Sequence, residues 1–189
     1  MLKKLVAVAL LVGLALPHSC HTSPILGAWG GALWTVMFGV PVLVTIVYAV
    51  HQLLPTLARF HERHGAALHG FFRAICLVLF GVYFGALLGE DVETRDVVTM
   101  AISLAVAATL LVWQQGRGTK AQRLPLLLLT IAGLGAVYAF ALFVGNGLEY
   151  GGWVVTAAWL LAVGVEVSDL RGAARVEHAS TRRLAATAR

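Results

Sequence analysis

The sequence predicts an all-α polytopic membrane protein: a bundle of five transmembrane helices, with a signal-like or sixth transmembrane segment at the N-terminus. Hydrophobic residues make up 59% of the 189 residues and charged residues only 12%, whereas soluble domains carry about 25% charged residues. The mean hydropathy is +0.84, and several apolar runs approach the roughly 20 residues that cross a bilayer. Of the 14 Lys and Arg residues, all but Arg95 fall in segments predicted to share one side of the membrane, as the positive-inside rule requires.

Residues 1–18 have the pattern of a secretory signal. Lys3 and Lys4 precede an apolar run that ends at Leu16, and Pro17 follows it. A basic start, a short hydrophobic stretch and a helix breaker are typical of such signals. No clean cleavage site follows, and Cys20 lies in only a weak match to a lipoprotein box. The segment either crosses the membrane once and stays, or is cleaved.

The predicted bundle occupies residues 19–167 and contains five spans. Pro41 in the first span predicts a kink, and neighbouring groups must satisfy the carbonyl that a proline leaves free. Residues 168–189 form a basic tail that either lies on an anionic leaflet or is disordered. The spans cover approximately Trp29–Leu54, Phe71–Gly89, Val97–Gln114, Leu124–Val144 and Tyr150–Val167.

The charges of the loops predict the orientation. The arginines of 55–73, the turn 116–123 and the tail are assigned to the cytoplasm, and the acidic segment 90–96 and Glu149 to the other side. This arrangement, with an Arg- and Ala-rich composition, predicts a bacterial inner-membrane protein whose C-terminus is cytoplasmic. The net charge of +5 is attributed to segments facing anionic headgroups, and nucleic acid is not an expected partner.

Three glycines mark one face of the second span. Gly81, Gly85 and Gly89 recur at four-residue spacing, and the third span repeats the pattern with Ala101 and Ala105. Such small-residue faces let helix backbones approach closely. Packing inside the chain is the favoured interpretation, and self-association or an interface with another membrane protein is the alternative.

The segment Pro55–Gly70 is unusually rich in histidine. It is best interpreted as a solvated or amphipathic stretch at the headgroups that Gly65 would interrupt. Imidazole is a common metal and haem ligand, so two alternatives are kept. His61 and His64 are the candidate metal ligands, and His51 and His69 are the candidate cofactor ligands.

Glu166 is the deepest acidic residue in a predicted span. An intramembrane carboxylate either reaches water or pairs with a basic residue, here expected to be a loop arginine, or it serves transport. No motif for nucleophilic catalysis or phosphate binding occurs, so an enzyme is not indicated and no cofactor is expected. The favoured function is a non-catalytic membrane subunit or accessory protein. The alternatives are a small-solute or ion transporter or channel using Glu166, and a haem- or metal-binding redox subunit.

Overall fold

The computed structural model describes residues 1–16, 35–88, 94–144 and 150–187, and within these ranges the chain is helical and has no strand. Five helices contain stretches long and apolar enough to cross a membrane, so the predicted all-helical membrane bundle is confirmed. The elements are α1 (Leu2–Ala15), the π-helical turn η1 (Thr35–Gly39), α4 (Val40–Leu53), α5 (Pro55–Leu87), α6 (Thr94–Gln114), α7 (Lys120–Val144) and α8 (Tyr150–Thr187).

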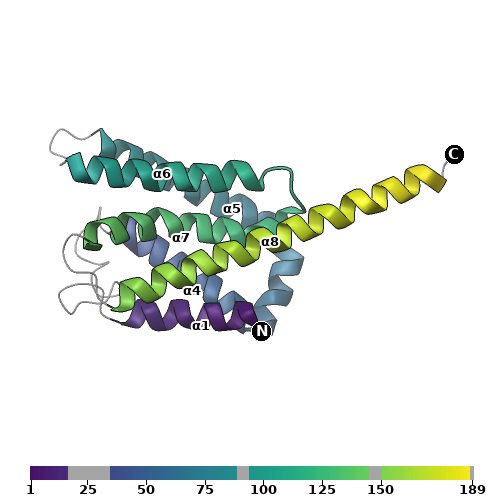
Figure 1. Cartoon of the computed structure of the whole chain (residues 1–189), viewed down its shortest axis with the longest axis horizontal. Helices are drawn as coiled ribbons and strands as arrows, with labels where there is room; N and C mark the ends of the chain where they lie inside the picture. The colour runs from purple at the N-terminus through teal and green to yellow at the C-terminus, as the bar shows by residue number, and fades with distance from the viewer. Residues whose placement is uncertain (17–34, 89–93, 145–149, 188–189) are drawn as a thin grey trace.

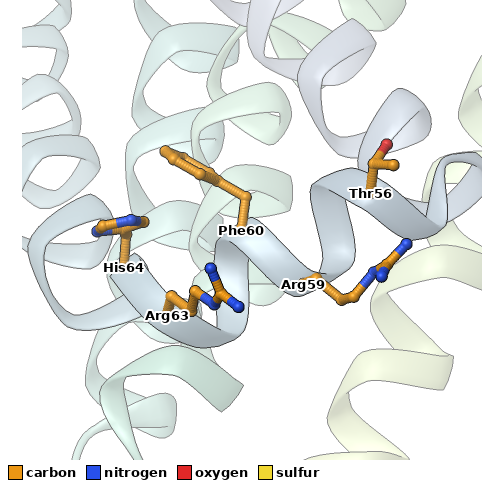
Figure 2. A pocket seen from close by; sticks show the side chains of 5 residues that line it. All are labelled: Thr56, Arg59, Phe60, Arg63 and His64. Atoms are coloured by element: carbon orange, nitrogen blue, oxygen red, sulfur yellow. The ribbon is translucent and has the colours of Figure 1, made fainter.

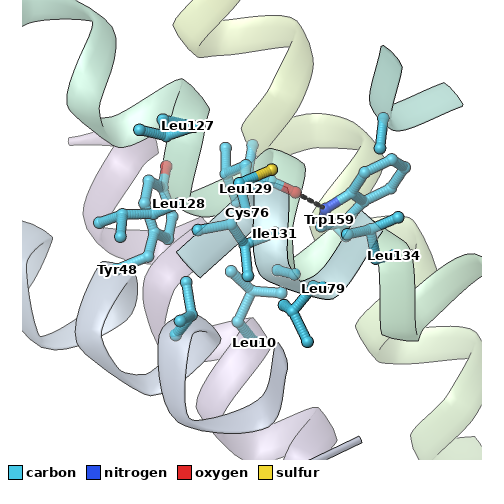
Figure 3. Packing of buried hydrophobic residues seen from close by; sticks show 14 of the residues in the cluster. Leu10, Tyr48, Cys76, Leu79, Leu127, Leu128, Leu129, Ile131, Leu134 and Trp159 are labelled. Atoms are coloured by element: carbon cyan, nitrogen blue, oxygen red, sulfur yellow. Dashed lines mark hydrogen bonds between the residues drawn. The ribbon is translucent and has the colours of Figure 1, made fainter. Parts of the chain in front are cut away.

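Helix α7 is the centre of the bundle. It lies between the pair α5 and α6 on one side and α1, α4 and α8 on the other (Figure 1). In its membrane-compatible stretch, 67% of the residues are buried inside the protein, against 17–33% in the other four. A helix that is apolar all round is buried all round, and the leucine-rich sequence of α7 satisfies this condition. Its fully buried side chains include Leu126 and, as Figure 3 shows, Leu127, Leu129, Ile131 and Leu134.

Helix α1 packs against α4 and α8. Lys3 at its start lies beside Glu166, whereas a Cβ on Gly13 near its end would lie 2.6 Å from Val155 Cγ2. Residue 166 follows residue 155 along α8, so α1 and α8 run antiparallel. The signal-like segment therefore occupies the place of a bundle helix, although 14 residues span only about 21 Å.

The basic segments meet at one end of the bundle. Lys3, His61, Ala121 and Asp169 line a common hollow, so the starts of α1, α5 and α7 and the later part of α8 lie together. Figure 1 shows the N-terminus at this end and α8 extending beyond it. We call it the basic end. The segments that the charge pattern assigns to one side of the membrane thus share one end of the bundle.

The predicted interruption at Gly65 is wrong. The polar segment Pro55–Gly70 and the span after it form one continuous helix, α5. Gly65 does not interrupt it, because this glycine lets α5 approach α7 so closely that a Cβ would lie 2.5 Å from Ala121 Cβ. The basic residues after residue 167 continue helix α8 as far as Thr187. Alanine and arginine, which dominate this stretch, are strong helix formers.

Candidate functional site

The most polar site in the described bundle surrounds Glu166 of α8 at the basic end. The residue is only 3% exposed. Its carboxylate accepts hydrogen bonds from Tyr48 Oη at 3.2 Å and Gln52 Nε2 at 3.4 Å, both on α4. Lys3 Nζ of α1 donates to Glu166 Oε2 at 2.9 Å and also contacts Asp169 Oδ2 at 2.6 Å. Three helices therefore converge on one carboxylate.

Lys3 supplies the counter-charge for Glu166. Burying a carboxylate without a partner costs several kcal/mol, and the pairing removes most of that cost. Burial alone would lower the pKa of Lys3, but the hydrogen bond to Asp169 and the charge of Glu166 outweigh it, so this pKa is raised above its usual value. The predicted pairing of Glu166 with a loop arginine is replaced by an ion pair with the N-terminal helix.

A hollow of 280 Å³ lies beside this cluster. Its lining combines one lysine with three carboxylates, so its polar surface favours cations and hydrogen-bond donors over anions. The rest of its lining comes mainly from α7 and α8. The lining residues are Lys3, His61, Glu62, Ala121, Gln122, Pro125, Glu166, Asp169, Leu170 and Ala173.

The four histidines proposed as ligands do not converge. The rings of His51 and His61 pack together with centroids 4.5 Å apart, whereas exposed His64 packs on Phe60 at 4.6 Å. His69 is buried further along α5. Within the described ranges, no three His, Cys, Asp or Glu side chains are grouped to hold a metal ion. Neither ring nitrogen of His51 has a hydrogen-bond partner there.

His61 has a structural contact that the sequence interpretation missed. Its Nε2 lies 2.6 Å from the carbonyl oxygen of Ala121. Ala121 is four residues before Pro125, which lies inside α7 and has no N–H to donate to that carbonyl. In the Nε2–H tautomer, His61 donates in its place. The spacing of Ala121 and Pro125 was visible in the sequence, but the donor, 60 residues away, was not.

Tyr83 satisfies the carbonyl that Pro41 leaves without a backbone donor, as His61 does for Pro125. It is fully buried, and its hydroxyl donates to the carbonyl of Met37 at 2.9 Å. Met37 is four residues before Pro41 and lies in the π-helical turn η1. The predicted distortion at Pro41 is thus present as η1, and a neighbouring helix satisfies the backbone as expected. Helix α5 supplies both donors.

The small-residue face of α5 is open. A Cβ on Gly81 or Gly85 would meet nothing within 4 Å, whereas on Gly133 it would lie 2.5 Å from Trp159 and on Gly135 2.6 Å from Pro41. An apolar groove of 590 Å³ is lined in part by Gly81, and Gly85 lies one turn further along α5. Gly89 lies outside the described residues. The groove is lined by Phe80, Gly81, Phe84 and Leu87 of α5 and by Ala101, Leu104, Ala105 and Ala108 of α6.

Comparison with known proteins adds no relative: no family model, no curated protein and no solved structure matches this chain. Its function has to be argued from the sequence and the geometry described above.

Proposed function

We propose that this protein is a non-catalytic membrane subunit that associates with a second copy of itself through the groove between α5 and α6. The observation that carries the proposal is the contrast among its glycines. Gly13, Gly133 and Gly135 each lie against a neighbouring helix, whereas Gly81 and Gly85 lie against nothing in the described chain. In lipid, such faces stabilise helix association by close van der Waals packing.

The groove is suited to another apolar helix. Its walls are aliphatic, aromatic and small side chains without a charge. Phe84 of α5 is 55% exposed beside Gly85, so the same face has both a ridge and a depression. In a two-fold symmetric pair each copy presents the same patch, and the ridge of one copy fills the depression of the other. This self-complementarity favours a second copy over an unrelated helix.

The polar cluster supports a structural role more than a transport role. Glu166 is paired with Lys3 and hydrogen-bonded by two further side chains, so its carboxylate is engaged in contacts between helices. The metal alternative is less favoured, because its two candidate ligands are engaged elsewhere, His61 with the α7 backbone and His64 with Phe60.

The location that we infer is the bacterial inner membrane, with the basic end in the cytoplasm. The supports are the five membrane-compatible helices and the gathering of Lys3, Arg59, Arg123 and Arg171 at the basic end or in segments that adjoin it. Basic segments are retained on the cytoplasmic side during insertion.

The test is the oligomeric state of Gly81→Leu/Gly85→Leu in lipid nanodiscs or by energy transfer between labelled copies. The expected result is a folded monomer, since a Cβ at either position meets nothing within 4 Å and the larger leucine side chains obstruct the α5–α6 face. Gly164→Leu is the matched control. Gly164 is also open, but it belongs to α8, which does not line the groove. Unchanged association of the double variant, or equal loss in the control, would refute the proposed interface.

A further inference from the structure

We propose that the first turns of α5 form a binding site for the phosphate of an anionic phospholipid headgroup. The site is a hollow of 360 Å³ lined by Thr56, Arg59, Phe60, Arg63 and His64. Figure 2 shows these side chains along one stretch of α5, with the Arg59 guanidinium directed toward the end that holds Thr56. It is separate from the groove between α5 and α6.

The spacing of the residues that line the hollow places them on one face of α5. Residues 56, 59, 60, 63 and 64 recur at three- and four-residue spacing and therefore share one side of a helix. The buried His61, Gly65 and His69 recur in the same way on the opposite side, where His61 and Gly65 contact Ala121 of α7. With α5 fixed through that buried face, the arginine face is directed away from the bundle.

The two arginines have no carboxylate partner. Lys3 makes both of the ion pairs found in the described chain, and Arg59 and Arg63 are exposed. Like charges one turn apart disfavour a helix in isolation, so an anion between them relieves a repulsion. Guanidinium groups bind phosphate oxygens in bidentate geometry, and His64 and the Thr56 hydroxyl add hydrogen-bonding groups.

The length of α5 places the hollow at the membrane boundary. The helix has 33 residues, about 50 Å at 1.5 Å per residue, and only about 20 residues are needed to cross the hydrocarbon. Counting back from Leu87, the first turns lie beyond the hydrocarbon. The hollow also follows directly on the end of the α4 span at Leu53.

The apolar neighbours indicate a lipid rather than a soluble phosphate. Phe60, which lines the hollow, is 50% exposed, and Leu54 and Leu57 nearby in the sequence are also exposed, so exposed apolar and cationic groups are interspersed at the start of α5. The ring of His64 packs on Phe60 with centroids 4.6 Å apart and supports this wall. Apolar side chains in contact with acyl chains beside arginines in contact with phosphates are typical of an interfacial helix.

The test is a titration of the purified full-length chain with phosphatidylglycerol, followed by native mass spectrometry. Arg59→Gln/Arg63→Gln is expected to lower the affinity roughly 10- to 30-fold, as loss of two interfacial cations implies. Arg59→Lys/Arg63→Lys retains the charge and is expected to recover only part of the affinity, because an ammonium lacks the bidentate fork.

The matched control is Arg171→Gln/Arg175→Gln, which removes two arginines at the same spacing from α8. The site is supported if this control changes the affinity less than about threefold and phosphatidylcholine binds much more weakly than phosphatidylglycerol. Equal losses in both double variants would show diffuse attraction and overturn it. Displacement of the lipid by millimolar inorganic phosphate would also overturn it, because the site would then be one for a soluble anion.

Discussion

Two prolines inside the bundle explain two buried polar side chains of α5. Pro41 and Pro125 cannot donate to the carbonyls of Met37 and Ala121, and Tyr83 and His61 lie within hydrogen-bonding distance of those carbonyls. Pro41 lies within a membrane-compatible stretch, where no water replaces a missing backbone donor. His61 is therefore better understood as a backbone partner than as a metal ligand.

Replacing Tyr83 by Phe removes one oxygen and leaves the ring in place. It is expected to lower the free energy of unfolding by about 1–2 kcal/mol, since a buried carbonyl loses its donor. In a Pro41→Ala background the loss is expected to shrink, because residue 41 then has an N–H of its own. Unfolding in mixed micelles measures the four proteins of this cycle. Equal losses in both backgrounds would contradict the pairing of Tyr83 with the proline.

The ion pair of Lys3 and Glu166 gives a second cycle. Lys3→Met is expected to cost about 2 kcal/mol of stability, less than a fully buried pair because the Lys3 side chain is 33% exposed. Glu166→Gln should cost less than the lysine variant, because Lys3 keeps its ion pair with Asp169 and the new amide keeps oxygen and nitrogen near Tyr48 and Gln52. The double variant is expected to lose less stability than the sum of the two single losses. Strictly additive losses in thermal unfolding would argue against the ion pair.

Helix α5 is the element that organises the others. Its side chains reach η1 through Tyr83 and α7 through His61, and its open face forms both the apolar groove and the arginine hollow. Because α5 makes these contacts at both of its ends, it has to be one continuous helix with a fixed rotation about its axis. Gly65 sets that register where α5 meets α7.

Gly65 and Gly70 provide a matched pair of substitutions on this helix. Gly65→Ala is expected to destabilise by about 1–3 kcal/mol, because its Cβ would lie 2.5 Å from the Cβ of Ala121. Gly70→Ala meets nothing within 4 Å and is expected to be neutral or to stabilise by up to about 1 kcal/mol. Thermal unfolding of both variants in one detergent is the measurement, and a reversed order would mean that α5 does not contact α7 there.

Hydropathy and loop charge predicted the membrane class and the five spans, because both patterns extend over segments of tens of residues. The sequence could not show that His61 satisfies Ala121 or that Lys3 pairs with Glu166, because 60 and 163 residues separate the partners. One signal was available: Lys3 and Glu166 were both assigned to the cytoplasmic ends of apolar segments. Gly65 misled the boundary prediction, since close packing outweighed its low helix propensity.

For the whole molecule, the gathering of the basic segments at one end predicts the sidedness of insertion. In a background without native cysteines, Lys4→Cys and Thr119→Cys are expected to react with an impermeant thiol reagent from the cytoplasmic side only. Leu88→Cys, at the far end of α5, is expected to react from the other side. Labelling of Lys4→Cys and Thr119→Cys from opposite sides would contradict the gathering of the starts of α1 and α7 at one end of the bundle.

The same background allows a decisive test of self-association by disulfide cross-linking in native membranes, with single cysteines at Gly81, Gly85, Ala101 or Gly164. If copies meet through the groove between α5 and α6, cross-linked dimers form at the first three positions and not at Gly164 on α8. If Gly164→Cys cross-links as readily as the groove positions, or if none of the groove positions cross-links, the α5–α6 face is not where this protein meets its partner.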